Sequence, residues 1–204
     1  WYQRYVGMLT QRALCWGLTV AGTRSTAPAA LDLPLPLRPA DGRAQRLHTA
    51  TLRSVREVSF GKKHLGILTF AGQVWTAGSG EDGALGHGDT CSAPQPRRVE
   101  ACAGRTLCSV SCGVSHSAVL TIDHEVILWG GNSSGQLGSG DTLLCAVPCT
   151  APAVASLPPI GAIACGGTHT LLAALFSSHV WVLGDDQMHS AHAATPHPPG
   201  VELL

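Results

Sequence analysis

The sequence predicts an all-β protein built from about four repeated, blade-like units. Two observations carry this prediction: a segment of roughly 50 residues recurs along the chain, and its apolar runs are short and separated by turn residues. Only 13% of the 204 residues are charged, whereas glycine occurs 24 times and proline 13 times. This composition is typical of an all-β chain or of a subunit partly covered by partners.

Residues 58–89 match residues 110–141 without a gap. The paired structural repeat positions are Gly61 with Gly113, His64 with His116, Gly78 with Gly130, Gly83 with Gly135, Gly86 with Gly138, and Asp89 with Asp141. A third copy starts near residue 163, where Gly166, His169 and Gly184 repeat Gly113, His116 and Gly130. We therefore interpret the chain as one propeller-type domain, residues 1–204, divided into units 1–57, 58–109, 110–162 and 163–204. The first unit is degenerate, with a Pro/Ala-rich insertion, and the last is also degenerate.

Each well-formed unit contains a hairpin signal and at least one further strand. In the third unit, residues 115–122 and 125–130 are apolar runs that flank a turn, and residues 105–113 precede them as another strand. Helical spacing is not sustained anywhere, except weakly over residues 43–57. Three to four short strands in each unit are typical of a β-propeller blade.

The stretch "VSCGVSHSAVLTIDHEVILWGGNSSGQLGSGD", residues 110–141, resembles the repeat of the regulator of chromosome condensation family. That family forms a β-propeller, usually of seven blades. The resemblance therefore implies a partial propeller, incomplete relative to a seven-bladed ring: a fragment, an open arc, or a piece completed by another polypeptide. The best-known member exchanges nucleotide on a small nuclear GTPase and also binds chromatin, so the resemblance implies nucleotide exchange as an alternative function for this chain.

The repeated glycines, histidines and aspartates are interpreted as structural. The glycine-rich stretch 128–141 lacks the lysine that a phosphate-binding loop requires, so its glycines are expected to form turns. We expect His64, His116 and His169 to hydrogen-bond turn backbone within their own units rather than to converge on a metal ion. Asp89 and Asp141 are expected to bond turn backbone in the same way.

Aromatic and cysteine side chains supply candidate core positions. Trp129 is expected to pack between blades, as are Trp16, Trp75 and Trp181. Cys112 and Cys165 stand where the preceding copy has Phe60, so we expect them to be buried strand residues.

The sequence predicts no catalytic, cofactor-binding or metal-binding residue and no cofactor, so we expect the chain not to be an enzyme. The close cysteine pairs Cys108/Cys112 and Cys145/Cys149 have three intervening residues, not the two of a zinc knuckle. The histidine-rich tract at His189, His192 and His197 is interpreted as adventitious surface histidines, with metal binding as the alternative.

Basic residues near the second unit are possible partner contacts. They are Arg43, Arg46, Arg53, Arg56, Lys62 and Lys63. Such residues can contact nucleic acid or an acidic protein face, but the net charge of the chain is zero. A solvated or partner-facing stretch is therefore the default interpretation.

These observations predict a non-catalytic scaffolding subunit of a larger intracellular assembly, with other protein subunits as partners. The alternatives are a guanine-nucleotide exchange factor for a small GTPase and an RNA- or organelle-ribosome-associated protein. The eight cysteines lack the spacing of a disulfide framework, which indicates a reducing compartment. Residues 1–31 contain arginine and no acidic residue, as in a mitochondrial presequence, so the mitochondrion is an alternative to the cytosol or nucleus. No apolar run approaches the roughly 18 residues of a membrane span.

Overall fold

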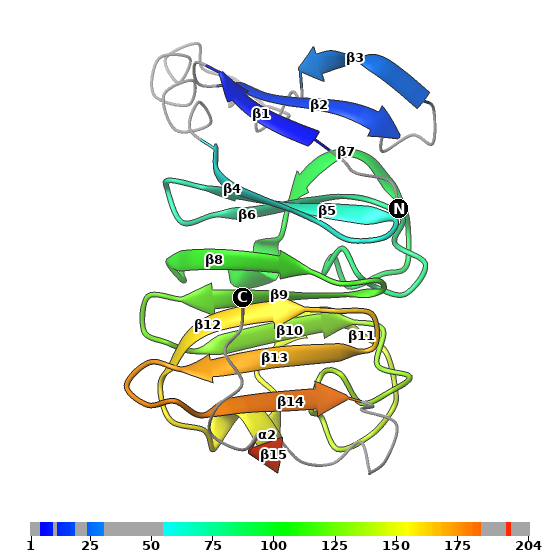
Figure 1. The fold of residues 1–204 in the computed structure, drawn as a ribbon. Helices are drawn as coiled ribbons and strands as arrows, with labels where there is room; N and C mark the ends of the chain where they lie inside the picture. Colours follow the sequence, from blue (N-terminus) through cyan, green and yellow to red (C-terminus); the bar gives the residue numbers. More distant parts are fainter. Residues whose placement is uncertain (1–4, 10–11, 19–23, 31–54, 185–194, 197–204) are drawn as a thin grey trace, which may run out of the picture.

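The structure, a computed structural model, describes residues 5–9, 12–18, 24–30, 55–184 and 195–196. It contains four antiparallel sheets that follow one another in chain order (Figure 1). The first sheet consists of β1 (Tyr5–Leu9), β2 (Arg12–Leu18) and β3 (Arg24–Ala30). The second consists of β4 (Val55–Phe60), β5 (His64–Thr69), β6 (Val74–Gly78) and β7 (Ala93–Arg98).

The third sheet consists of β8 (Leu107–Cys112), β9 (His116–Thr121), β10 (Val126–Gly130) and β11 (Cys145–Cys149). The fourth consists of β12 (Ile160–Cys165), β13 (His169–Ala174), β14 (Val180–Gly184) and β15 (Thr195–Pro196). A short 3₁₀ helix (Glu100–Cys102) and helix α2 (Pro152–Ala155) lie in the crossings between sheets. The expected all-β, partial-propeller architecture is confirmed.

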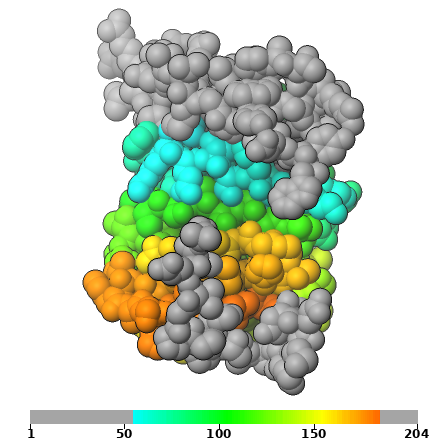
Figure 2. All heavy atoms as spheres, in the orientation of Figure 1, coloured from blue at the N-terminus to red at the C-terminus, as the bar shows by residue number. Residues whose placement is uncertain are grey.

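The second, third and fourth sheets pack face to face through their strands, and Figure 2 shows them as successive bands. The first strand of each of these sheets contacts the first strand of the next, β4 with β8 and β8 with β12. Every residue of β9 and β10 is buried, because alternate side chains enter two different cores. Val119 and Trp129 pack toward the second sheet, whereas Leu120 and Leu128 pack toward the fourth.

Burial in the fourth sheet alternates along the strands instead. In β14, Trp181 and Leu183 are buried against the third sheet, and the other three residues of the strand are only partly buried. Half-burial of this kind means that, within the described residues, only one face of the fourth sheet is fully covered.

The hairpin expected around residues 115–130 is present as β9 and β10, and the strand expected at 105–113 is β8. The second, third and fourth sheets begin at Val55, Leu107 and Ile160, three residues before the unit boundaries drawn from the sequence. The weak helical spacing at 43–57 was misleading at its end, since Val55 to Glu57 are part of strand β4, and the remainder lies outside the described residues.

The strand ends define two opposite edges of the stacked sheets. The hairpin turns 70–73, 122–125 and 175–179 lie together on one edge, which we call the hairpin face (Figure 1). The loops 61–63, 113–115 and 166–168 and the glycine-rich turns lie at the other ends of the same strands, on the glycine face. Gly130 pairs with both His116 and Cys145, which places the start of β11 on the glycine face as well.

Candidate functional site

A hydroxyl group joins the repeat histidines of the second and third blades, His64 and His116, to the following blade. His64 Nε2 lies 2.9 Å from Ser117 Oγ, and Ser117 Oγ donates a hydrogen bond to the Ala84 carbonyl at 2.9 Å. Because the single hydroxyl proton of Ser117 is used on Ala84, Nε2 of His64 donates to the Ser117 oxygen. Ser117 therefore bonds two parts of the preceding blade at once.

The same bridge recurs one blade later. His116 Nε2 lies 3.0 Å from Thr170 Oγ1, which donates to the Gln136 carbonyl at 2.8 Å. We expected His116 to bond turn backbone within its own unit, and this was wrong: its Nε2 reaches the next blade, and its buried Nδ1 has no partner within the described part of the chain. Burial, with smaller effects of His64 and His169, lowers the pKa of His116 to about 4. The ring is therefore neutral at physiological pH.

His169 occupies the matching position in the fourth sheet, and none of the described residues gives its ring a hydrogen bond. The signal that reveals the bridge is the residue that follows the histidine: Ser117 and Thr170 are hydroxylic, whereas Leu65 follows His64. Sequence reasoning noticed the histidines and missed these partners.

The glycine-rich turn of the second blade is held against strand β10 of the third. Trp129, which is fully buried, donates from Nε1 to the Ala84 carbonyl at 2.8 Å. Gly86 has a φ of +74°, and a Cβ there would lie 2.8 Å from Trp129 Nε1. Glycine is required at this position both by the left-handed backbone and by the closeness of the indole.

The other repeat glycines lie in turns or at the ends of strands. Positive φ values occur at Gly78, Gly83, Gly130, Gly135, Gly138 and Gly184. Gly61, Gly113 and Gly166 follow the first strands, where Lys62 N donates to Gly113 O at 3.2 Å and Val114 N to Gly166 O at 3.2 Å.

The expected role of the two aspartates is confirmed. Asp89 accepts a hydrogen bond from Cys91 N at 3.0 Å, and Asp141 accepts one from Leu143 N at 3.2 Å. The side chain of Asn132 also donates to Asp141, at 2.8 Å to its carbonyl. These carboxylates therefore stabilise the turns that end the glycine-rich segments.

The expected core positions are largely buried. Trp75 and Trp181 lie in hydrophobic clusters, as does Trp129, whereas the side chain of Trp16 lies outside the described residues. Cys112 is buried, and Cys165 is partly buried. Burial raises the pKa of each of these two thiols to about 12, so both are poor nucleophiles at neutral pH.

The basic residues do not form one patch among those that the structure describes. Arg56 is exposed at the hairpin-face end of β4, whereas Lys62 and Lys63 lie on the glycine face. Lys63 pairs with Glu81 at 2.9 Å, so its charge is partly balanced. Arg43, Arg46 and Arg53, together with His189, His192 and His197, lie outside the described residues.

The hairpin face exposes one large apolar side chain from each of three consecutive hairpin turns. Phe70 is 67% exposed, Ile122 54% and Phe176 85%. Sequence reasoning missed them because each directly follows an apolar strand run and looks like its continuation. Turn positions usually carry polar or small residues, so three exposed apolar residues at matching turns are an unusual feature of this face.

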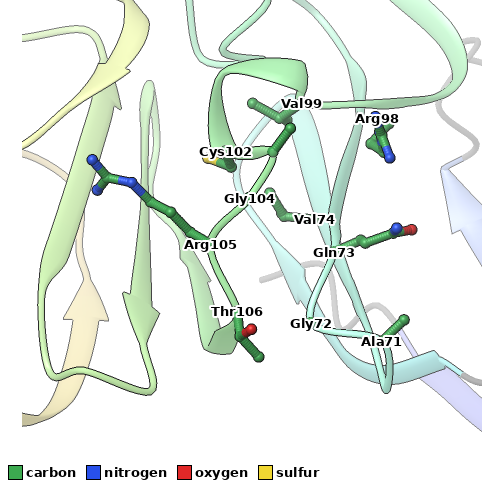
Figure 3. Close-up of a pocket in the computed structure, with 11 residues that line it drawn as sticks. Ala71, Gly72, Gln73, Val74, Arg98, Val99, Cys102, Gly104, Arg105 and Thr106 are labelled. Carbon is green, nitrogen blue, oxygen red and sulfur yellow. The ribbon is translucent and has the colours of Figure 1, made fainter.

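A pocket of about 250 Å³ lies beside Phe70, between the β5–β6 turn and the crossing that leads to β8 (Figure 3). Its buried apolar wall consists of Val74, Val99 and Cys102. Arg98 and Arg105 also line it; Arg98 forms an ion pair with Glu100, and Arg105 with Glu125 at 3.3 Å. Burial raises the pKa of Cys102 to about 11, which keeps this thiol protonated at neutral pH.

Within the described ranges, no group of three or more histidine, cysteine or acidic residues is arranged to hold a metal ion. The search for a helix long and apolar enough to cross a membrane, made over the same residues, found none.

Two models of the Regulator of chromosome condensation (RCC1) repeat match the chain, one at residues 71–120 and 123–173 and the other at 107–136. Protein RCC2 of Mus musculus is 37% identical over 109 residues, which are 53% of this chain and 21% of that protein. The serine/threonine-protein kinase Nek8 of Danio rerio is 42% identical over 85 residues, 42% of this chain and 12% of that protein. The chain thus spans about a fifth or less of the length of these relatives.

Two solved structures are similar in fold. Human WBSCR16 aligns with a TM-score of 0.64 and 25% identity, over 71% of this chain and 38% of that one. Yeast RCC1 (Prp20) bound to Kap60 aligns with a TM-score of 0.69 and 14% identity, over 96% of this chain and 49% of that one. The repeat matches run continuously over residues 71–173, and the sheets stack as in these propellers. The chain belongs to the regulator of chromosome condensation (RCC1) repeat family.

Proposed function

We propose that this chain is a non-catalytic protein-interaction module that docks a partner protein on its hairpin face. The observation that carries the proposal is the row of Phe70, Ile122 and Phe176, one exposed apolar side chain from each of three neighbouring hairpin turns. Single exposed apolar residues are normal on protein surfaces, but their repetition at three neighbouring turns of one face supports docking there.

The pocket next to Phe70 also supports docking of a partner on the hairpin face. Ligand pockets for small molecules usually measure about 300–1000 Å³, and this pocket, at about 250 Å³, is smaller. Its apolar wall and arginine-bearing rim suit a side chain inserted by a partner protein. The functional groups of the repeat, by contrast, are engaged in structural bonds: His64 and Ser117 join blades, and Asp89 closes a turn.

Similar propellers bind proteins. Yeast RCC1 (Prp20) has been solved bound to Kap60. A further structure of Prp20p was described together with the binding of Prp20p to Gsp1p and histones. We place the assembly in a reducing compartment, because the spacing of the cysteines in the sequence lacks the pattern of a disulfide framework.

The experiment compares quantitative affinity capture by three forms of the chain. The first is unmodified, the second carries Phe70→Ser, Ile122→Ser and Phe176→Ser, and the third carries Val114→Ser, Leu143→Ser and Leu144→Ser. The third is a matched control, because its residues are also exposed and apolar but lie on the glycine face. We expect captured proteins to be lost only with the second form. Equal capture by the second and first forms would contradict the proposal.

Two further assays separate the alternative functions. The first is nucleotide release from candidate small GTPases, where catalysed release would favour exchange over scaffolding. The second is retention on RNA at increasing salt, where salt-sensitive retention would favour an RNA-associated role. We expect neither.

A further inference from the structure

The outer strand of the third blade brings two cysteine side chains together. Cys145 Sγ and Cys149 Sγ lie 3.7 Å apart, although the residues are four apart on one strand. In a regular strand, such residues are separated by about 13 Å, at roughly 3.3 Å per residue. A large bulge in β11 accounts for the difference, because Leu128 and Gly130, two apart on β10, pair with Cys149 and Cys145, four apart on β11.

The bulge belongs to the repeat, whereas the cysteines do not. In the second blade, Thr76 and Gly78 pair with Arg97 and Ala93 in the same two-against-four pattern. Arg97 and Ala93 thus occupy the places of Cys149 and Cys145 without any sulfur. A repeat that forms this bulge without cysteine does not need the thiols for its fold.

We propose that Cys145 and Cys149 are a redox-active dithiol that closes to an intramolecular disulfide by exchange with a small-molecule disulfide such as oxidised glutathione. Cys149 is exposed and Cys145 partly exposed, so an oxidant of this size reaches them. Rotation about the side-chain bonds has to shorten the sulfur–sulfur separation by less than 2 Å to reach bonding distance.

The disulfide forms in two thiol–disulfide exchange steps. The Cys145 thiolate attacks one sulfur of oxidised glutathione, forms a mixed disulfide and expels one glutathione thiolate. Cys149 then loses its proton to solvent and attacks the Cys145 sulfur, which forms the intramolecular bond and releases the second glutathione thiolate. Burial of the sulfur, followed by the neighbouring Cys145 thiol, raises the pKa of Cys149 to about 11. The second step therefore becomes faster as the pH rises.

The dithiol lies where one blade contacts another. Ala146, between the two cysteines, accepts a hydrogen bond from Gly88 N of the second blade at 3.0 Å. The backbone of Ala146 also lies against Gly83, where an added Cβ would be 2.9 Å from Ala146 Cα. Closing the disulfide fixes the bulge and slows hydrogen exchange at the Gly88 amide.

Cys108 and Cys112 provide a matched internal control. They have the same sequence spacing, but Cys108 packs on the core shared with the fourth sheet and Cys112 lies in the core shared with the second. Their side chains are therefore on opposite sides of the third sheet and cannot join.

The test incubates the reduced, folded chain with oxidised glutathione, alkylates the remaining thiols after denaturation and maps every cysteine by mass spectrometry. We expect Cys145 and Cys149 to lose alkylation together as an internal disulfide, while Cys108 and Cys112 remain alkylated. Cys145→Ser and Cys149→Ser should each leave a glutathione adduct on the remaining cysteine of the pair.

Separate glutathione adducts on Cys145 and Cys149 of the unmodified chain would overturn the proposal, as would closure of Cys108 with Cys112 at an equal rate. A titration of the unmodified chain in glutathione redox buffers needs no variant. It should give one two-electron transition for the Cys145–Cys149 pair, and two independent one-thiol reactions would contradict this.

Discussion

His64 Nε2 lies 2.9 Å from Ser117 Oγ, so a side chain of the second blade is hydrogen-bonded to a side chain of the third across 53 positions of sequence. The bridge from His116 to Thr170 repeats the relationship one blade later. The second, third and fourth blades are thus joined by buried polar bonds at the glycine-face ends of their strands. A buried bond of this kind fixes the register of one sheet on the next, since a slipped sheet would leave its donors and acceptors unpaired.

Removing the bridging hydroxyl should destabilise the chain. Ser117→Ala and Thr170→Val each leave a buried histidine donor and a backbone carbonyl with one bond fewer, at a cost of about 1–3 kcal/mol. The exposed Ser178→Ala variant is the control, and it should change stability by less than about 0.5 kcal/mol. Urea unfolding followed by tryptophan fluorescence measures the three differences. Equal stability of all the variants would show that the bridges are not needed.

The buried His116 should make stability fall in acid. The unfolded chain takes up a proton as the pH falls through 6.5, whereas the folded chain does so only near a pKa of about 4. Stability is therefore complete above 6.5, is lost as the pH falls from 6.5 to 4, and levels off below, with a total loss of up to about 3 kcal/mol. His116→Gln should remove this part of the pH dependence. Urea midpoints across this pH range, compared between the two proteins, give the measurement; parallel curves would contradict the assignment.

Gly86 and Gly104 distinguish two reasons why a position requires glycine: a left-handed backbone and a lack of space for a side chain. Both have positive φ, +74° and +84°, but an added Cβ meets Trp129 at Gly86 and nothing within 4 Å at Gly104. Gly104→Ala should cost about 1–2 kcal/mol, the cost of the left-handed backbone. Gly86→Ala should cost about 1–3 kcal/mol more, because the indole must move. Thermal and urea unfolding of both variants test this, and equal losses would mean that the contact with Trp129 does not constrain the turn.

Two buried tryptophans should respond differently to the same substitution. Trp129 Nε1 donates to Ala84 O, whereas Trp75 Nε1 is buried without a partner among the described residues. Trp129→Phe removes a bond, but Trp75→Phe removes an unpaired donor, so its loss of stability should be smaller by about 1–3 kcal/mol. Comparing the two free energies of unfolding tests this. A larger loss for Trp75→Phe would show that its indole nitrogen does have a partner.

The sequence predicted what lies within a blade better than what lies between blades. The β9–β10 hairpin and the turn bonds of Asp89 follow from local spacing and turn chemistry, so they could be predicted. The bond from His116 to Thr170 depends on how one sheet is stacked on the next, which no period within a unit encodes. The role of the hydroxyls that follow His116 and His169, those of Ser117 and Thr170, becomes clear only when the blades are stacked.

The exposed apolar residues and the close cysteine pair could not be predicted from the sequence for a related reason. Phe70 continues an apolar run in the sequence and is recognised as exposed only once β5 is seen to end at Thr69. Cys145/Cys149 and Cys108/Cys112 have identical spacing, and only the bulge in β11 brings the first pair together. Strand ends and bulges are set by pairing between strands, and that pairing depends on the whole sheet.

The most direct test of the proposed docking face is hydroxyl-radical footprinting of the chain alone and in complex with a captured partner. We expect labelling of Phe70, Ile122 and Phe176 to fall in the complex, while labelling of Val114, Leu143 and Leu144 stays unchanged. Protection of the glycine face with unchanged labelling of the three hairpin residues would contradict the account.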